Sequence, residues 1–183
     1  HNCMITVIDK IEKERITPED FVALIEIPKN GKKKYELDKT TGFMIMDRIL
    51  YTSTHYPSNY GLIPRTLADD GDHLDVLVLS SECIETNILV RCYPIGMITM
   101  IDQNSKDDKI IAIPFSDPVY NCYSSIDQLP YHVAQEMMHF FSIYKELEGK
   151  KTAVDRIHTA EEAKQCIREC LEAFIKENEE QQN

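Results

Sequence analysis

The stretch that decides the fold is residues 67–79, which read Leu-Ala-Asp-Asp-Gly-Asp-His-Leu-Asp-Val-Leu-Val-Leu. Its aspartates are Asp69, Asp70, Asp72 and Asp75. The apolar run Val76–Leu79 predicts a short buried strand directly behind them. Gly71 permits a tight turn that a residue with a Cβ atom would resist. We therefore expect the turn to gather the last three aspartates at the mouth of that strand.

Carboxylates crowded in this way repel one another unless a positive charge lies between them. A divalent cation with oxygen ligands suits such a cluster. An acidic surface turn is the simpler alternative. A helix-loop-helix calcium site is excluded, because counting from Asp70 puts Asp75 and Ser81 where that motif needs glycine and an acid.

Composition narrows the classes of protein that remain. The chain has 183 residues, enough for one domain over 1–183, and its net charge of −11 disfavours nucleic acid or an anionic membrane as a partner. No apolar run approaches the ~20 residues of a membrane helix, and no secretory signal is visible. The six cysteines form no C-x-x-C pair, so we expect reduced thiols and a cytoplasmic protein. Residues 1–3 are expected to be a remnant or a truncated start.

Short runs separated by proline, glycine and polar residues predict many strands. The expected strands are 21–27, 32–38, 43–50, 76–79, 88–93, 95–100 and 109–113. The tyrosine-rich segment 51–65 is expected to be irregular, and the acidic segment 101–109 to be a loop between two strands. This even spacing of short strands favours a closed or nearly closed barrel.

Two amphipathic helices are expected near the end of the chain. Pro130–Glu148 has an apolar stripe at helical spacing and is followed by Gly149. Thr159-Ala160-Glu161-Glu162 is a capping box that opens the second helix. The polar residues 177–183 are expected to fray.

At this point the motifs resemble those of a known family. The heptad 70–76, Asp-Gly-Asp-His-Leu-Asp-Val, is similar to the signature of soluble family I inorganic pyrophosphatases of the shorter prokaryotic type. Further motifs follow the family's order from about Pro18 to the last helix. They are Ile25-Glu26-Ile27-Pro28, Lys34-Tyr35-Glu36, Asp47-Arg48, Tyr56-Pro57-Ser58-Asn59-Tyr60-Gly61, Asp102 with Asp107 and Lys109, and Phe140-Phe141-Ser142-Ile143-Tyr144-Lys145.

The resemblance implies metal-dependent hydrolysis of pyrophosphate to two orthophosphates by a metal-activated water. It implies several Mg²⁺ ions per subunit, with Mn²⁺ as a substitute, and a homohexamer. The implied fold is mainly β with flanking α: an OB-like five-stranded β-barrel packed by two C-terminal helices. The chain departs from the family where His73 replaces a usual proline. It also departs where Gly149-Lys150-Lys151-Thr152 stands in place of a lysine-glycine-lysine-tryptophan run, which leaves open whether Lys150 or Lys151 takes the role of the family's lysine.

The resemblance also implies roles for individual residues. Asp72 is carried over as the general base, typically worth about 10²–10⁴ in rate. The implied metal ligands are Asp70, Asp75, Asp102 and Asp107. The implied phosphate-binding residues are Lys34, Arg48, Tyr60, Tyr144 and Lys145. A supporting shell comprises Glu26, Glu36, Tyr56 and Lys109.

Two other functions fit the residues less well. A metallophosphatase would cleave nucleotides or phosphomonoesters faster than pyrophosphate. A non-catalytic OB-like module would bind single-stranded nucleic acid or a structural metal, but the acidic balance and the scarcity of basic-aromatic stripes oppose nucleic acid.

Overall fold

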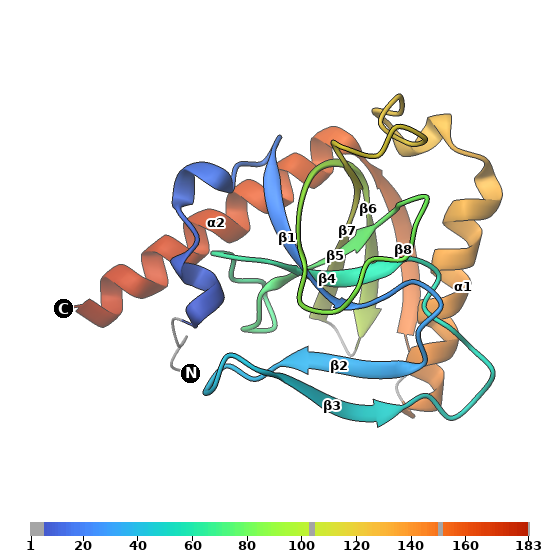
Figure 1. Ribbon diagram of the computed structural model, residues 1–183, viewed down its shortest axis with the longest axis horizontal. Helices are drawn as coiled ribbons and strands as arrows, with labels where there is room; N and C mark the ends of the chain where they lie inside the picture. Colours follow the sequence, from blue (N-terminus) through green and yellow to red (C-terminus); the bar gives the residue numbers. More distant parts are fainter. Residues whose placement is uncertain (1–5, 103–104, 150–151, 183) are drawn as a thin grey trace.

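The computed structural model describes residues 6–102, 105–149 and 152–182, and its centre is a closed ring of five strands (Figure 1). The strands follow one another around the ring in the order β1 (Phe21–Ile27), β4 (Asn59–Ile63), β5 (Leu74–Val78), β7 (Ser105–Pro114) and β6 (Leu89–Asp102). Pairing of β6 with β1 closes the ring. β5 and β7 are parallel and the other ring pairs are antiparallel. The expected five-stranded barrel is therefore confirmed.

β6 is one long strand where the sequence predicted two. It pairs with β1 through residues 89–92, with β7 through 92–102, and with an additional strand, β8 (Thr152–Thr159), through 96–102. The predicted break at Pro94 is wrong because a register shift between Pro94 and Gly96 lets the strand continue past the proline. The ends of β6 and β7 also take up most of the segment 101–109, which was expected to be a loop.

β4 lies inside the segment that was expected to be irregular. It pairs with both β1 and β5, so it is a central member of the ring. Gly61 allows the close approach to β1, because a Cβ atom at this position would lie 1.9 Å from the backbone oxygen of Leu24. Gly61 therefore suggested a break in the sequence, but in the structure it allows the segment to form a strand.

A two-stranded hairpin, β2 (Lys33–Leu37) and β3 (Met44–Ile49), lies beside the ring (Figure 1). Both strands were predicted. Lys34 and Arg48 are opposite each other in the register, so the hairpin presents two cations side by side.

Two helices complete the fold, α1 (Tyr131–Leu147) and α2 (Ala160–Gln182), and both were predicted. α1 packs on one face of the sheet, where Leu77 and Ile111 meet Phe140. α2 packs on another, where Val76 and Ile110 meet its own apolar residues. Alternate residues of β5 and β7 therefore serve different clusters, as the two-residue period of a strand requires.

The helix ends and the short helices have simple local causes. Thr159 and Glu162 exchange the two hydrogen bonds of the predicted capping box at the start of α2. α2 continues to Gln182, through most of the polar tail. Single turns of 3₁₀ helix occur at η1 (Val7–Lys10), η2 (Lys13–Arg15) and η3 (Ile126–Gln128).

The described cysteines, Cys83, Cys92, Cys122, Cys166 and Cys170, are free thiols. Within the described ranges, neither long helix has the length and apolarity needed to span a membrane.

Candidate active site

The hairpin, the mouth of the ring and the last turns of α1 surround a cavity of about 620 Å³. Most of the predicted site residues line it, although they come from distant parts of the chain. These residues are Glu26, Lys34, Glu36, Tyr56, Tyr60, Asp70, Asp72, Asp75, Asp107, Lys109, Tyr144 and Lys145. Arg48 reaches the same space through Tyr144, to which its Nη2 donates a hydrogen bond of 2.8 Å. The side chain of Asp102 and residues Lys150 and Lys151 lie outside the described parts of the chain.

The acidic turn has the geometry that its glycine predicted. Gly71 adopts a φ of 88°, in the left-handed region. The backbone N–H of Gly71 donates to the Ala68 carbonyl at 3.0 Å, and the N–H of Ala68 donates to the Asp72 carbonyl at 2.8 Å. The N–H of Asp72 donates to Oδ1 of Asp70 at 2.9 Å. These bonds hold the turn closed and bring Asp70 and Asp72 to the cavity.

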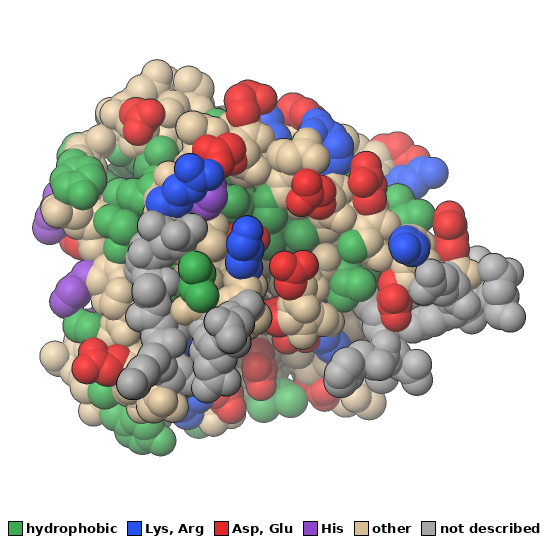
Figure 2. Space-filling model, turned by 180° about the vertical axis from the view of Figure 1, so that it is seen from behind, with side chains coloured by type: hydrophobic (Ala, Val, Ile, Leu, Met, Phe, Trp, Pro, Cys, Tyr) green, Lys and Arg blue, Asp and Glu red, His purple; other side chains and the backbone are tan. Residues whose placement is uncertain are grey.

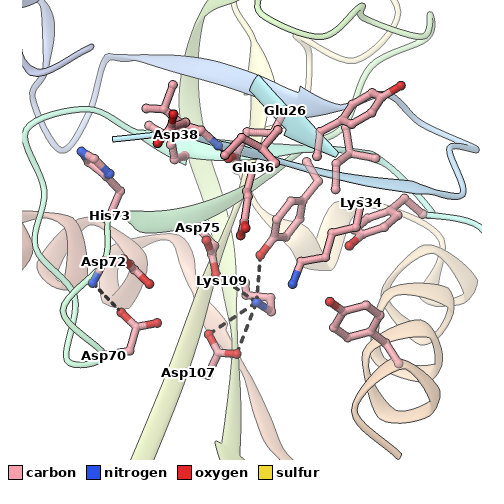
Figure 3. Close-up of a pocket in the computed structure, with 18 of the residues that line it drawn as sticks. Glu26, Lys34, Glu36, Asp38, Asp70, Asp72, His73, Asp75, Asp107 and Lys109 are labelled. Carbon is pink, nitrogen blue, oxygen red and sulfur yellow. Dashed lines mark hydrogen bonds and ion pairs between the residues drawn. The ribbon is translucent and has the colours of Figure 1, made fainter. Parts of the chain in front are cut away.

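A buried lysine, Lys109, lies beside two of the aspartates in the cavity (Figure 3). Lys109 Nζ is 3.0 Å from Oδ2 of Asp75, 3.4 Å from Asp107 and 3.1 Å from the hydroxyl of Tyr60. It also lies 4.9 Å from the centroid of the Phe141 ring. The sequence had placed Lys109 in a supporting shell, and the structure makes it the cation that two of the aspartates share.

Lys109 and Asp107 shift each other's pKa. Burial alone would lower the pKa of Lys109, but the charges of Asp75 and Asp107 hold it above its ordinary value. Burial would raise the pKa of Asp107, but Lys109 and Lys145 keep it below the ordinary value. Lys145 Nζ lies 3.5 Å from Oδ2 of Asp107. Asp107 is therefore ionised at neutral pH and can accept a further cation.

Two other carboxyl groups are shifted in the opposite direction. Partial burial, with Asp75 and Asp72 nearby, raises the pKa of Asp70. Burial and the charge of Asp75 raise the pKa of Glu26 to about 8, although Glu26 accepts a 3.0 Å hydrogen bond from the N–H of Leu37. Glu26 is thus mainly protonated at neutral pH and adds little negative charge to the cavity.

The opposite side of the cavity carries cations and hydroxyl groups. Lys34 Nζ lies 3.6 Å from Asp47 Oδ2 and 5.7 Å from the centroid of the Tyr144 ring. Arg48 forms ion pairs with Asp47 and Glu148 and stacks on Tyr144 at 5.4 Å. The guanidinium and ammonium groups therefore converge on one tyrosine at the end of α1, where an anion could contact all three.

Tyr56 and Tyr60 contribute hydroxyl groups from the floor of the cavity. Burial raises the pKa of each above its ordinary value. Both phenols stay protonated and can donate hydrogen bonds without adding charge. Their rings lie 5.4 Å apart, and Tyr56 packs 4.6 Å from Phe140, so the aromatic core of α1 orients the pair.

Sequence reasoning missed several polar residues of the site. Lys39 lines the cavity and forms an ion pair with Asp72. Glu148 lines it and pairs with Arg48, and Asp47 pairs with both predicted cations of the hairpin. Asp47 adjoins Arg48 in a quoted motif, so sequence proximity could have flagged it. Lys39 and Glu148 gave no signal, because only the fold brings each to its partner.

The donors fit a hard divalent cation. In the described part of the chain, no three carboxylate, imidazole or thiol groups are arranged to hold one ion. Mg²⁺ does not require such a cage, because it usually binds one or two carboxylates and keeps several waters. Asp70, Asp75 and Asp107 offer oxygen donors of this kind around one space (Figure 3).

Comparison with known proteins agrees with this geometry. A family model described as inorganic pyrophosphatase matches residues 23–175. The chain belongs to the inorganic pyrophosphatase family. Soluble inorganic pyrophosphatase 2 of Chlamydomonas reinhardtii is 47% identical over 156 residues, 85% of this chain and 81% of that protein. The inorganic pyrophosphatase of Aquifex pyrophilus is 46% identical over 162 residues, 87% and 92% of the two chains.

Solved structures of this family have the same fold. The inorganic pyrophosphatase of Helicobacter pylori superposes with a TM-score of 0.85 at 36% identity, covering 90% of this chain and 98% of that one. The inorganic pyrophosphatase of Thermus thermophilus gives 0.83 at 33% identity, covering 95% and 99%. Membership in the inorganic pyrophosphatase family favours an enzyme over a binding module.

Proposed function

We propose that this protein hydrolyses inorganic pyrophosphate to two orthophosphates, using a metal-activated water. The observation that carries the proposal is the division of one cavity into two sides. Asp70, Asp75 and Asp107 lie on one side, where Lys109 and Lys145 pair with the last two. The hairpin cations Lys34 and Arg48 lie on the other side, against Tyr144. A small, highly charged anion together with its metal ions matches that division, because the ions need oxygen ligands and the phosphates need lysine and arginine.

Mg²⁺ is the proposed cofactor, several ions per subunit, with Mn²⁺ as a substitute. Asp70, Asp75 and Asp107 would hold the ions, with Asp102 as a further ligand. The bound ions would supply Lewis acidity, which neutralises phosphate charge and lowers the pKa of a water. Lys109 and Lys145 hold the pKa of Asp107 below its ordinary value, so this carboxylate is ready to bind a cation without first losing a proton.

Asp72 is the proposed general base. It lies in the acidic turn beside Asp70, and its side chain is 66% exposed, so a water in the cavity can reach it. Lys39, which also lines the cavity, forms an ion pair with its Oδ1.

The proposed phosphate-binding groups are Lys34, Arg48, Tyr60, Tyr144 and Lys145. Arg48 offers a planar fork suited to two phosphate oxygens, whereas the lysines act as compact charges. Glu148 and Asp47 occupy the guanidinium of Arg48, and an incoming phosphate would compete with them for it. The proposed supporting residues are Glu26, Glu36, Tyr56 and Lys109, which orient or neutralise these groups.

Turnover of pyrophosphate tests the proposal directly. Purified protein with Mg²⁺ and pyrophosphate should release phosphate, and Asp72→Asn should reduce kcat by about 10²-fold or more because it removes the base. A panel with nucleotides and phosphomonoesters runs in parallel. Faster cleavage of an organic phosphate would replace this proposal with a general metallophosphatase, and equal turnover by wild type and Asp72→Asn would remove Asp72 as the base.

The protein is further proposed to be a single-domain, cytoplasmic homohexamer of the shorter prokaryotic type. Exposed apolar side chains at Phe43, Met46 and Tyr51, on and next to the hairpin, support self-association. Sedimentation in solution tests the assembly.

Small-molecule binding rather than nucleic-acid binding fits the charge of the surface. The face in Figure 2 carries acidic and basic side chains interspersed, without a broad basic field. The net charge of −11 points in the same direction.

A further inference from the structure

His73 belongs to the acidic turn but does not face the carboxylates beside it. Its ring points away from the carboxyl groups of Asp70 and Asp72 (Figure 3). Its Nε2 lies 2.9 Å from Oδ1 and 3.1 Å from Oδ2 of Asp9, a residue of η1 that is 64 positions away in the chain. The side chains of His73 and Asp9 are only 8% and 1% exposed, so the contact is buried.

Asp9 also accepts hydrogen bonds from two other segments of the chain. Its Oδ1 accepts a 2.8 Å hydrogen bond from the backbone N–H of Arg65, and its Oδ2 accepts one of 3.0 Å from the Thr6 hydroxyl. The guanidinium of Arg65 donates to the backbone oxygen of Asp9 at 2.9 Å. One buried carboxylate thus ties together the N-terminal segment, the residues after β4 and the acidic turn. A buried polar group satisfied on all sides in this way has little freedom to move.

The same N-terminal segment also touches the hairpin. A Cβ atom at Gly42, in the turn between β2 and β3, would lie 2.9 Å from Cγ1 of Val7. η1 therefore packs against one wall of the cavity through Val7 and against the acidic turn through Asp9.

We propose that Asp9 is a positioning residue that acts through His73 to hold the acidic turn in its metal-binding shape. The inference rests on the proposed function only for the identity of the ions. His73 lies between Asp72 and Asp75, and the backbone on both sides is constrained. Leu74 N–H donates to the Thr66 hydroxyl at 2.9 Å, and the Asp72 carbonyl accepts from Ala68. With the ring anchored, the flanking carboxylates cannot swing out of the cavity.

A pair of substitutions at His73 tests the hydrogen bond without disturbing the core. His73→Gln puts an amide N–H close to the position of Nε2, whereas His73→Asn reaches only as far as Nδ1. We expect His73→Asn to raise the Mg²⁺ dissociation constant about tenfold, in the range found for residues that orient metal ligands, and His73→Gln to restore most of the affinity. Isothermal titration calorimetry with MgCl₂ alone measures this without turnover.

Substitutions at Asp9 give the reciprocal test. Asp9→Asn keeps an acceptor for Arg65 and a donor for the imidazole, whereas Asp9→Ala keeps neither. Asp9→Ala should weaken Mg²⁺ binding like His73→Asn and should speed amide hydrogen exchange in residues 69–73, and Asp9→Asn should have a smaller effect. The matched control is Glu12→Ala, because Glu12 pairs only locally with Arg15 at the surface and should leave both measurements unchanged.

The outcomes separate the inference from the proposed function. Unchanged Mg²⁺ affinity in His73→Asn, or equal weakening in His73→Gln and His73→Asn, overturns the positioning role. Absence of pyrophosphate turnover in wild type would overturn the proposed function alone, since calorimetry and hydrogen exchange report on the turn directly. If turnover is present, the Mg²⁺ concentration for half-maximal activity should rise in His73→Asn while kcat at saturating Mg²⁺ stays within about twofold, since the ligands themselves are intact.

Discussion

Lys109 is the residue on which the electrostatics of the cavity depend. Its side chain is 4% exposed, and its ammonium group contacts Asp75, Asp107 and Tyr60 together. A buried charge is tolerated only when it is paired, so each of these groups depends on the others. This dependence could not be predicted from the sequence, because Lys109 reads as one polar residue at the start of an apolar strand.

Lys109→Met should therefore be strongly destabilising. It leaves Asp75 and Asp107 without their shared cation, and we expect the free energy of unfolding in metal-free buffer to fall by about 3–5 kcal/mol. Lys164→Met is the control, because Lys164 pairs at 3.0 Å with Glu161, whose side chain is 83% exposed, and should change stability by less than about 1 kcal/mol. Urea denaturation measures both, and equal effects would contradict the central role of Lys109.

Glu26 gives a prediction about pH. Its pKa of about 8 in the folded protein exceeds its ordinary value of 4.5, so the folded protein keeps a proton that the unfolded chain has lost between these two values. The stabilising contribution of this proton is complete below the lower value and is lost as pH rises through the higher one.

Glu26→Gln removes this titration and keeps an acceptor for the N–H of Leu37. In chelator, the stability of the variant relative to wild type should increase by more than about 2 kcal/mol between about pH 5 and pH 8. Urea titrations of both proteins at the two pH values measure the difference. Parallel pH profiles would show that Glu26 is not protonated in the folded state.

At the scale of elements, the sequence was most informative where a periodic pattern coincided with one strand or helix. β1, the hairpin, α1 and the capped start of α2 were predicted because each carries its own pattern or cap. β4 was missed because Pro57, Gly61 and Pro64 read as breaks. β8 was missed because its eight residues alternate poorly and follow a helix end. Both strands form by pairing with strands that are distant in the sequence, and a short window of sequence does not reveal such pairing.

Gly61 tests the idea that close strand approach decides the position of β4. Gly61→Ala puts a methyl group against the Leu24 carbonyl and should destabilise the protein by about 3 kcal/mol or more, since backbone must move. Gly71→Ala is the matched control, because a Cβ there meets no atom within 4 Å and only the positive φ is strained. That control should lose about 1–2 kcal/mol. Thermal unfolding of the two variants distinguishes contact from conformation, and equal losses would contradict the crowding.

At the scale of the whole molecule, the sequence predicted which residues form the candidate site but not how they contact one another. The motifs named nearly all the polar residues of the cavity, because each motif is short and local. The Asp9–His73 contact, the Lys39–Asp72 pair and the Arg48–Glu148 pair were not predictable, since they join segments 33 to 100 residues apart. Only the closed ring brings those segments together.

Binding of Mg²⁺ should stabilise the whole fold. A ligand that binds only the folded state at 100 times its dissociation constant adds about 2.7 kcal/mol. The melting temperature should therefore rise with MgCl₂ and fall again with excess EDTA. Asp70→Asn should lose most of the rise, whereas Asp69→Asn, a neighbour without an assigned role, should keep it. Differential scanning calorimetry measures the shift, and an equal rise in all three proteins would place the stabilising ion elsewhere.

β6 belongs to both hydrophobic clusters, because Ile98 and Met100 pack toward α1 while Cys92 and Met97 pack toward α2. It is also hydrogen-bonded to three partner strands. We therefore expect the two hydrophobic clusters to unfold together, since both include side chains of the same continuous strand. Heating should produce a single cooperative unfolding transition. The cavity should be lost in that same transition, without a partly folded form that keeps it.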